Sequence, residues 1–417
     1  MKLGRTFSNL VCITDNRKGE YMNYIVFPGE LDLRRGGPSG YIANLNEGLK
    51  TIGGNQEVNL IVNENVLTAV ESKNKISKLK SILGKSNFIT ERIMEKKSID
   101  LRDITIRSKL QNMNFSHSDV IHLHNVMDYN KIKEYNFSSK LVLTPHTPES
   151  VADEFVDVVR NTFKNQNLKL KRYKNKIKEV EDRAFKECEY FIFPSKESME
   201  IYGTFVDDFE EIIKDKKVYF NMTGSKPLSY KMNQEAFRKK YGIAQDAFVI
   251  SYIGRHNSIK GFDILKEAAK AIHEMDPSIV FVSGGTGDIK AESDNFIQIG
   301  WTDDPGSIVN ASDLFVLPNR NTYFDLVLLE VLSLGTPVLA SNTGGNKTVA
   351  SLTDGVKLFE SENIQVLISS ILELKKDMNY LKQMRNENID VFHNYFTLEK
   401  FATRYIDILK EIRKDIK

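Results

Sequence analysis

The segment from Leu314 to Gly345 limits the possible folds of this chain more than any other stretch. An apolar run, Leu314–Leu317, is followed by a polar loop and then by an apolar segment of helical length, Leu326–Leu334. A second short apolar run over residues 337–340 leads into a pair of glycines. This strand–loop–helix–strand spacing predicts a parallel α/β sheet, in which ligands bind at the carboxyl ends of the strands.

The start of the Leu326–Leu334 helix predicts an anion site. The first backbone N–H groups of a helix have no partner inside it, so those near Leu326 and Val327 are available to a ligand. On the second turn, Glu330 places a carboxylate among apolar residues, which is costly unless a hydrogen-bond donor meets it. This donor could be a backbone N–H at the edge of the core, or it could be a hydroxyl of a bound sugar or ribose. Both interpretations stay open.

Length and composition are those of an ordinary globular protein. The 417 residues suggest about two to three domains, and 41% hydrophobic with 27% charged residues supply an ample core. A net charge of only +2 gives no case for nucleic acid as a partner. Cys12 and Cys188 lack metal-type spacing and fit a reducing compartment. Without a signal peptide or a membrane-spanning run, we expect a cytoplasmic protein, with peripheral membrane contact left open.

A loop with two cations follows another predicted strand, Ala247–Ile253. Arg255 and Lys260 lie between this strand and a helical segment, Phe262–Ile272. Arginine can grip two phosphate oxygens at once, and lysine acts as a point charge. Fixed cations help most where charge develops on a departing diphosphate. The loop therefore predicts a phosphate site, against the alternative of two surface cations.

A glycine-rich loop follows the first predicted strand, Tyr24–Phe27. Gly36 and Gly37 would let the backbone approach a phosphate or sugar closely, and the helical stretch Tyr41–Leu49 would add N–H donors. A plain turn with a helix-starting proline explains the same residues.

Three histidines lie at the ends of two further predicted strands. His122 and His124 belong to a buried strand over residues 119–125, and we expect them to face opposite ways and so not to share a metal. His124 lies at the carboxyl end of its strand, where α/β sites form, and His146 ends the next strand. Such a histidine could serve as a general base in an inverting enzyme, and a structural role is the alternative.

Residues 163–185 form the most basic stretch. Apolar residues recur at helical spacing on one face, and lysines and an arginine occupy the other. A second basic run spans Lys73–Lys85. These stretches are either solvated surface helices or a surface that docks on an anionic membrane or a polyanionic acceptor. The second interpretation predicts that Lys→Glu changes at Lys169, Lys171 and Lys174 weaken sedimentation with anionic liposomes.

The segments around Leu314–Gly345 and Arg255–Lys260 resemble the signatures of family-4-type retaining glycosyltransferases. The positions shared in the first segment are Pro318, Phe324, Leu326, Glu330, Gly335, Pro337, Val338, Gly344 and Gly345. Two positions differ: the first acid of the family's glutamate pair falls on Thr322, and the glycine after Phe324 is Asp325. The resemblance covers nearly the whole chain, strongly over residues 246–346 and loosely before them.

The resemblance implies the GT-B fold, an α/β architecture of two Rossmann-like, doubly wound domains that face a central cleft. We expect an N-terminal acceptor-binding domain over residues 1–228 and a C-terminal nucleotide-sugar-binding domain over residues 229–395. A C-terminal helix over residues 396–417 is expected to pack back on the first domain.

The resemblance also implies roles for residues. Glu330 would bind the ribose hydroxyls, His124 would orient the sugar, and Asp325 would take over from the acid missing at Thr322. The catalytic candidates are Arg255, Lys260, His124 and Asp325. The donor-binding candidates are Gly36, Gly37, Arg255, Lys260, Gly300, Trp301, Thr322, Phe324, Leu326, Val327 and Glu330. No metal and no cofactor are expected.

Together these expectations describe a retaining glycosyltransferase that uses a nucleotide-diphosphate sugar, with UDP as the nucleotide. Its acceptor would be a glycan, a lipid-linked sugar or a protein in bacterial surface-glycan synthesis. Three alternatives stay open: a catalytically silent GT-B subunit that supports a partner transferase, a nucleotide-sugar epimerase, and a module that binds nucleic acid or a membrane.

Overall fold

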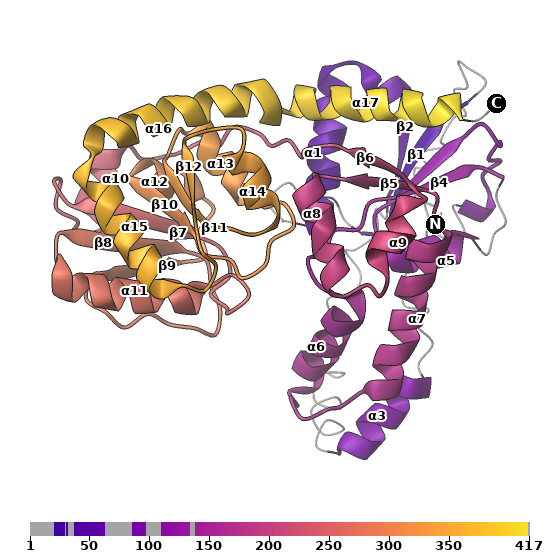
Figure 1. Ribbon diagram of the computed structural model, residues 1–417, viewed down its shortest axis with the longest axis horizontal. Helices are drawn as coiled ribbons and strands as arrows, with labels where there is room; N and C mark the ends of the chain where they lie inside the picture. The colour runs from indigo at the N-terminus through magenta and orange to yellow at the C-terminus, as the bar shows by residue number, and fades with distance from the viewer. Residues whose placement is uncertain are drawn as a thin grey trace, which may run out of the picture.

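The structure is a computed structural model that describes residues 21–29, 31, 37–62, 86–96, 110–133 and 138–415. Within these residues it has two sheets of six parallel strands, which form the cores of two domains lying side by side (Figure 1). Gly36, Cys12 and the basic run Lys73–Lys85 lie outside the described residues.

The first domain is built on a sheet with the strand order β2-β1-β3-β4-β5-β6, whose winding reverses between β1 and β3. Its strands are β1 (Asn23–Phe27), β2 (Val58–Val62), β3 (Val120–Leu123), β4 (Lys140–Leu143), β5 (Tyr190–Phe193) and β6 (Lys217–Phe220). Its helices are α1 (Gly37–Thr51), η1 (Gly54–Gln56), α3 (Asn87–Lys96), α5 (Val126–Lys133), α6 (Val151–Phe163), α7 (Lys171–Glu187), α8 (Lys196–Glu200), η2 (Ile201–Thr204) and α9 (Phe209–Lys214).

The second domain is built on a sheet with the order β12-β11-β10-β7-β8-β9, whose winding reverses between β7 and β10. Its strands are β7 (Phe248–Ile253), β8 (Ile279–Gly284), β9 (Phe296–Gly300), β10 (Leu314–Leu317), β11 (Val338–Ser341) and β12 (Val356–Phe359). Its helices are α10 (Gln234–Lys240), α11 (Phe262–Met275), α12 (Pro305–Asn310), α13 (Leu326–Ser333), α14 (Gly344–Ala350), α15 (Ile364–Lys376) and α16 (Met378–Val391).

The strands form where the sequence is continuously apolar. Every residue of β3, β5 and β10 is buried, because helices cover both faces of a parallel sheet and leave no solvated side. The sequence predicted β10 with its observed bounds and α13 to within one residue. Both switch points, where ligands bind in such sheets, face the region between the domains.

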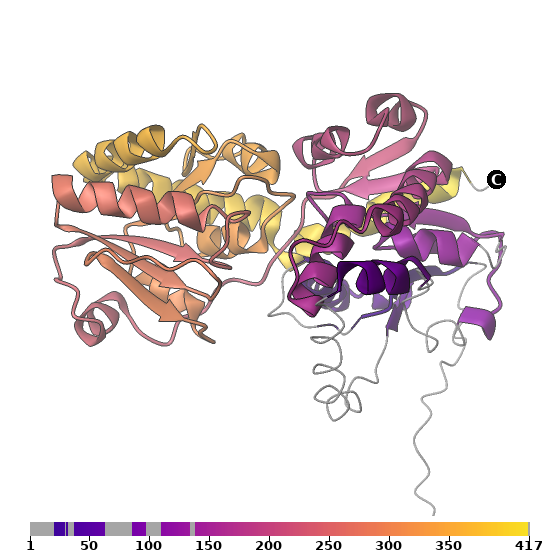
Figure 2. The ribbon, with the colours of Figure 1, turned by 90° about the horizontal axis from the view of Figure 1, so that it is seen from below.

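The chain returns to the first domain after completing the second. A π-helical segment, η3 (Phe392–Phe396), joins α16 to α17 (Leu398–Lys414), which crosses onto the first domain (Figures 1 and 2). There, apolar side chains of α17 share one core with those of α1. Tyr405 of α17 also contacts His122 at the centre of the first sheet, with 2.9 Å between the hydroxyl and Nδ1.

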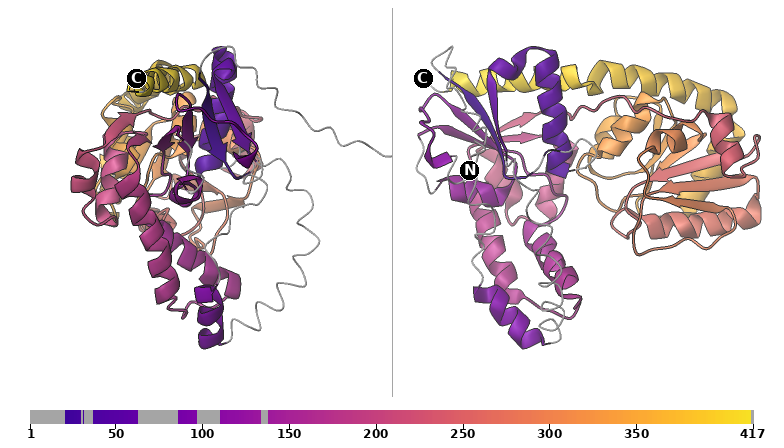
Figure 3. Two further views of the ribbon diagram at one scale, coloured as in Figure 1. Left: turned by 90° about the vertical axis from the view of Figure 1, so that its right-hand side faces the viewer. Right: turned by 180° about the vertical axis from the view of Figure 1, so that it is seen from behind.

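Three helices project from the first domain as an arm. α6 and α7 pack against each other, and α3 packs against α7 at the far end (Figures 1 and 3). The sequence predicted helix throughout residues 163–185, but α7 begins at Lys171. The prediction was wrong for residues 164–170 because Lys164 and Leu170 adopt positive φ angles, of 52° and 51°, and turn the chain back on α6. Among the described residues, no helix combines the length and apolar character that crossing a bilayer requires.

The two domains also touch directly beside the cleft. The Ser198 hydroxyl of α8 donates to the carbonyl of Tyr323, at 2.5 Å. Thr348 of α14 donates to the Glu197 carboxylate, at 2.7 Å, and the Asn321 amide donates to the carbonyl of Pro148, at 2.6 Å. The loop after β10 is therefore held by both domains.

Candidate functional site

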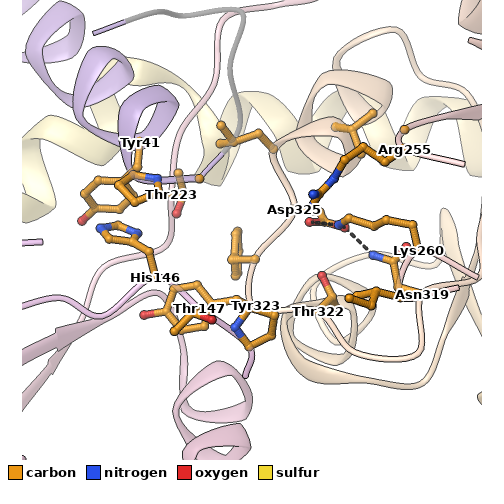
Figure 4. Close-up of a pocket in the computed structure, with 18 of the residues that line it drawn as sticks. Tyr41, His146, Thr147, Thr223, Arg255, Lys260, Asn319, Thr322, Tyr323 and Asp325 are labelled. Atoms are coloured by element: carbon orange, nitrogen blue, oxygen red, sulfur yellow. Dashed lines mark hydrogen bonds and ion pairs between the residues drawn. The ribbon is translucent and has the colours of Figure 1, made fainter. Parts of the chain in front are cut away.

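A cleft of about 1480 Å³ lies between the two domains, at the carboxyl ends of both sheets. On one side it is lined by the segments that follow β1, β3 and β4, and on the other by those that follow β7, β8, β9 and β10 (Figure 4). Residues at the switch points of both sheets therefore line the cleft.

The second-domain wall carries the two predicted phosphate-binding cations. Arg255 is exposed to the cleft just after β7, and Lys260 lies half-buried five residues further on. The Lys260 ammonium donates to both carboxylate oxygens of Asp325, at 2.8 and 2.9 Å. The amide of Asn319 donates to the same carboxylate. Lys260 and Asp325 thus form a preassembled ion pair within the cleft (Figure 4).

The ion pair decides the charge state of Asp325. Burial alone would raise the pKa of this carboxyl, but the Lys260 ammonium and the hydrogen bonds outweigh burial and hold the pKa below its usual value. Asp325 is therefore ionised at neutral pH, and it neutralises the charge that a phosphate would otherwise meet on Lys260.

Backbone and side-chain contacts hold the loop that carries Lys260 against the loop that carries Asp325. The N–H of Arg320 donates to the carbonyl of Ile259, at 3.1 Å, and the Arg320 guanidinium grips the Asp263 carboxylate through two bonds of 2.8 Å. Gly261 has a φ of +65°, and a Cβ there would lie 1.8 Å from the carbonyl oxygen of Pro318. The close approach of the loops therefore requires glycine at this position.

Glu330 lines the cleft from the second turn of α13. Its surroundings are apolar, and burial raises the pKa of the carboxyl to about 7. Within the described part of the chain, no donor to this carboxylate is found. The sequence left open a backbone partner or a ligand hydroxyl, and the structure shows a carboxylate that lines the cleft without a donor from the described residues.

The first-domain wall presents uncharged aromatic side chains. The Nδ1 atom of His124 lies 2.9 Å from Nε2 of His146, and Tyr41 packs against both rings. Burial lowers the pKa of His146 to about 3 and that of His124 well below its ordinary value, so both rings are neutral at pH 7. The Nε2 atom of His124 and the hydroxyl of Tyr41 are buried and find no hydrogen-bond partner among the described residues, although both residues line the cleft.

The expectation that His122 and His124 face opposite ways was wrong. Their ring centroids are 4.1 Å apart, because residues two apart in a strand lie on the same face. His122 is nevertheless held away from the cleft, since its nitrogens contact Tyr405 and Thr144, at 2.9 and 2.8 Å. Among the described residues, no group of histidine, cysteine, aspartate and glutamate side chains is arranged to hold a metal ion.

Most of the predicted site residues meet at the cleft. Trp301 lies at its rim with 73% of its surface exposed. Gly300 does not line the cleft. Its carbonyl accepts a hydrogen bond from the N–H of Gly285, and Gly285 does line the cleft. Gly36 lies outside the described residues. The predicted residues that line the cleft are Gly37, His124, Arg255, Lys260, Trp301, Thr322, Phe324, Asp325, Leu326, Val327 and Glu330.

Sequence reasoning missed several residues of the site. Asn319 orients Asp325, and its only signal was its place directly after the strand and Pro318. Tyr41 and Tyr323 bring their rings to the histidines from helix α1 and from the loop after β10. Nothing in the local sequence marks these aromatic residues, because Tyr41 meets the histidines through the packing of α1 on the first sheet and Tyr323 meets His146 only where the two domains touch.

Comparisons with known proteins agree with this architecture. Residues 247–377 match a family described as "Glycosyl transferases group 1". The UDP-Gal:alpha-D-GlcNAc-diphosphoundecaprenol alpha-1,3-galactosyltransferase of Escherichia coli is 29% identical over 187 residues, which are 41% of this chain and 48% of that protein. The N-acetyl-alpha-D-glucosaminyl L-malate synthase of Bacillus anthracis is 23% identical over 248 residues, which are 57% of this chain and 60% of that protein. The chain thus spans about half the length of the curated relatives it matches.

Solved structures share the fold over most of the chain. Sucrose-phosphate synthase from Thermosynechococcus elongatus superposes with a TM-score of 0.65 at 15% identity, covering 95% of this chain and 100% of that one. The Anabaena protein HepE, solved in complex with UDP-glucose, superposes with a TM-score of 0.58 at 13% identity, covering 94% and 99%. The predicted two-domain GT-B fold is therefore confirmed.

Proposed function

We propose that this chain, whose residues 247–377 match the family of group 1 glycosyl transferases, moves a sugar from a UDP-sugar to an acceptor hydroxyl with retention of anomeric configuration. The acceptor class is a glycan, a lipid-linked sugar or a glycosylated protein of a bacterial surface. The first domain would bind this acceptor and the second would bind the donor, with the boundary between them near residue 228.

One observation carries the proposal: four features suited to a nucleotide-diphosphate sugar line a single wall of the cleft. Arg255 and Lys260 offer positive charge, and the start of α13 offers N–H groups to the same region. One turn further along α13, Glu330 offers a carboxylate that has no donor among the residues the structure describes. Diphosphate oxygens would meet the cations and N–H groups, and ribose hydroxyls would donate to Glu330.

The chemistry follows from this placement. The bond between the anomeric carbon and the diphosphate oxygen breaks, and the acceptor hydroxyl attacks from the same face. Its proton passes to the departing diphosphate oxygen, so no protein base is required. Arg255 and Lys260 stabilise the negative charge that builds on the leaving group. These side chains supply the positive charge for that step, and the proposed reaction uses no metal and no cofactor.

Asp325 has a second task in this proposal. When a diphosphate binds the Lys260 ammonium, the carboxylate of Asp325 loses this partner and can turn toward the transferred sugar. There it takes the place of the acid that the resembling enzymes carry at the position of Thr322. Thr322 lines the same wall, and its buried hydroxyl lies close enough to Asp325 to help lower the pKa of that carboxyl.

On the opposite wall, His124 orients the sugar and does not act as a base. Its low pKa leaves the ring neutral, and its buried Nε2 atom, which has no partner among the described residues, is the atom that a sugar hydroxyl would contact. A general base would need a pKa closer to the working pH.

The relatives support the choice of donor and acceptor. The Escherichia coli relative is named for UDP-galactose as donor and a diphosphoundecaprenol-linked sugar as acceptor. A second relative from that species is named an O-antigen biosynthesis glycosyltransferase, 26% identical over 191 residues. Cys188 is free and buried, which agrees with a reducing, cytoplasmic setting for the reaction.

Calorimetric titration tests the proposal. UDP, GDP and several UDP-sugars are titrated into the wild type, into Arg255→Ala and into Arg183→Ala. Arg183 is an exposed arginine on the arm and serves as the matched control. We expect micromolar binding of UDP that is lost in Arg255→Ala and kept in Arg183→Ala.

Binding of no nucleotide by the wild type would overturn the transferase proposal and favour the silent subunit. Binding followed by conversion of a UDP-sugar into its epimer, without any acceptor, would identify the epimerase alternative instead.

A further inference from the structure

The far end of the arm exposes apolar side chains on a short helix. Phe88, Ile89 and Ile93 of α3 have 70%, 46% and 40% of their surfaces exposed. On the neighbouring helix α6, Val158 is 57% exposed. Large apolar side chains rarely gather on an exposed surface unless they meet a partner.

The end of the arm is held in shape by several hydrogen bonds. The amide of Asn165 donates to the side-chain oxygen of Asn87, at 2.7 Å. The backbone N–H of Lys169 donates to the Glu91 carboxylate, at 2.8 Å. These bonds fix the loop over residues 164–170 beside α3, and the exposed side chains of α3 and of this loop are together called the arm tip here.

The cations of the arm tip are available to a partner. Lys164, Lys169 and Lys171 are exposed, and none forms an ion pair with another described residue. Further along the arm the pattern changes, since Lys174 pairs with Asp153 and Lys178 pairs with Asp182. The available positive charge is thus concentrated beside the exposed apolar side chains.

We propose that the arm tip docks on an anionic lipid surface, with Phe88, Ile89 and Ile93 entering the interface while Lys164, Lys169 and Lys171 meet the headgroups. This combination of apolar side chains with unpaired lysines matches a layer that is negatively charged outside and apolar within. A nucleic acid would use the lysines but would leave the two isoleucines in water. The inference does not depend on the proposed reaction.

Docking at the arm tip fixes where the cleft would lie. Glu154, in the first turn of α6, lines the cleft, and Phe163 ends that helix at the arm tip. The 13 residues of α6 span about 20 Å at 1.5 Å per residue. The cleft would therefore lie about one helix length away from the lipid, within reach of a headgroup-linked chain and not of the headgroup itself.

Co-sedimentation with vesicles tests the proposal without donor or acceptor, so its outcome is separate from that of the transfer reaction. The full chain is mixed with vesicles of phosphatidylcholine alone or of phosphatidylcholine with phosphatidylglycerol. One variant combines Phe88→Ser with Ile93→Ser, and another combines Lys164→Glu, Lys169→Glu and Lys171→Glu. The matched control combines Lys270→Glu, Lys376→Glu and Lys382→Glu, three exposed lysines of the second domain.

We expect the wild type and the control to sediment only with the anionic vesicles. Partitioning should fall on the order of a hundredfold in the lysine variant and roughly tenfold in the apolar variant. A wild type that stays in the supernatant would overturn the proposal, and so would an equal loss in the control. Self-association that disappears with Phe88→Ser and Ile93→Ser would instead assign the arm tip to a second copy of the chain.

Discussion

At the scale of single residues, Asp325 distinguishes this site most clearly from the resembling enzymes. It stands where they carry glycine. Its carboxylate forms an ion pair with the Lys260 ammonium in the absence of a ligand. A diphosphate that binds Lys260 must displace this carboxylate. In the proposed reaction Asp325 would therefore weaken the binding of the donor and of the product nucleotide, because it already pairs with Lys260.

We predict that Asp325→Asn binds UDP about three- to tenfold more tightly than the wild type, because Lys260 loses its competing anion. Turnover of the UDP-sugar should fall at the same time, since the carboxylate beside the transferred sugar is lost. Calorimetry and an assay of released UDP measure the two effects. Asp303→Asn is the control, because Asp303 lines the same cleft but pairs with the exposed Lys231. Weaker UDP binding by Asp325→Asn would mean that Asp325 positions Lys260 for the phosphate and does not compete with it.

A second residue-scale prediction concerns pH. The pKa of Glu330 is about 7, so raising the pH through 7 ionises the carboxyl and improves it as an acceptor for ribose hydroxyls. UDP should therefore bind more tightly at pH 8 than at pH 6. Glu330→Gln should bind more weakly at pH 8 and lose this part of the pH dependence. The ionisation of UDP itself is common to both proteins, so identical pH profiles would exclude Glu330 from nucleotide binding.

At the scale of elements, the cleft depends on how closely the loop after β7 approaches the loop after β10. Gly261 and Gly242 both adopt positive φ, of +65° and +68°, but a Cβ at Gly242 would meet nothing within 4 Å. We predict that Gly242→Ala costs about 1 kcal/mol in the free energy of unfolding, from backbone strain alone. Gly261→Ala should cost at least about 3 kcal/mol, because strain adds to a collision with Pro318.

Urea denaturation measures both variants, and calorimetry with UDP follows the site. Equal losses in the free energy of unfolding would show that the close contact between the loops does not contribute to stability.

Elements were predicted best where one stretch of sequence determines them. The apolar run Leu314–Leu317 and the helix after it needed no distant partner, and the strand and helix formed close to their predicted bounds. The turn at Lys164 and Leu170 could not be predicted, since neither residue favours positive φ and contacts with α3 hold the loop. The partners of Asp325 lie six and 65 residues away, so the motif showed that a site exists but not its internal pairing.

At the scale of the whole molecule, α17 completes the first domain after the chain has passed through the second. Phe401, Tyr405 and Leu409 are buried in the same core as α1. Arg404 donates to the side chain of Asn221 and to the carbonyl of Met222, at 3.2 and 2.6 Å, where the chain leaves the first domain.

We predict that a chain ending at Phe396 leaves the first domain unfolded while the second keeps its structure. Limited proteolysis should then degrade residues before about 228 and spare a fragment that contains β7–β12, because only the first domain loses core side chains. A chain ending at Asp415 is the control, since it keeps all of α17. Survival of the first domain without α17 would show that its own helices suffice.

The position of α17 also bears on how the protein is made. Domains usually fold in the order in which they leave the ribosome. Here the second domain holds all of its own core before α17 is made, whereas the first sheet, synthesised earlier, would have α1 alone on the face that it later shares with α17. During that interval its strands would be open to chaperones and to premature pairing, and synthesis that stopped before α17 would leave a chain in which the second-domain wall of the cleft is formed and the first-domain wall is not.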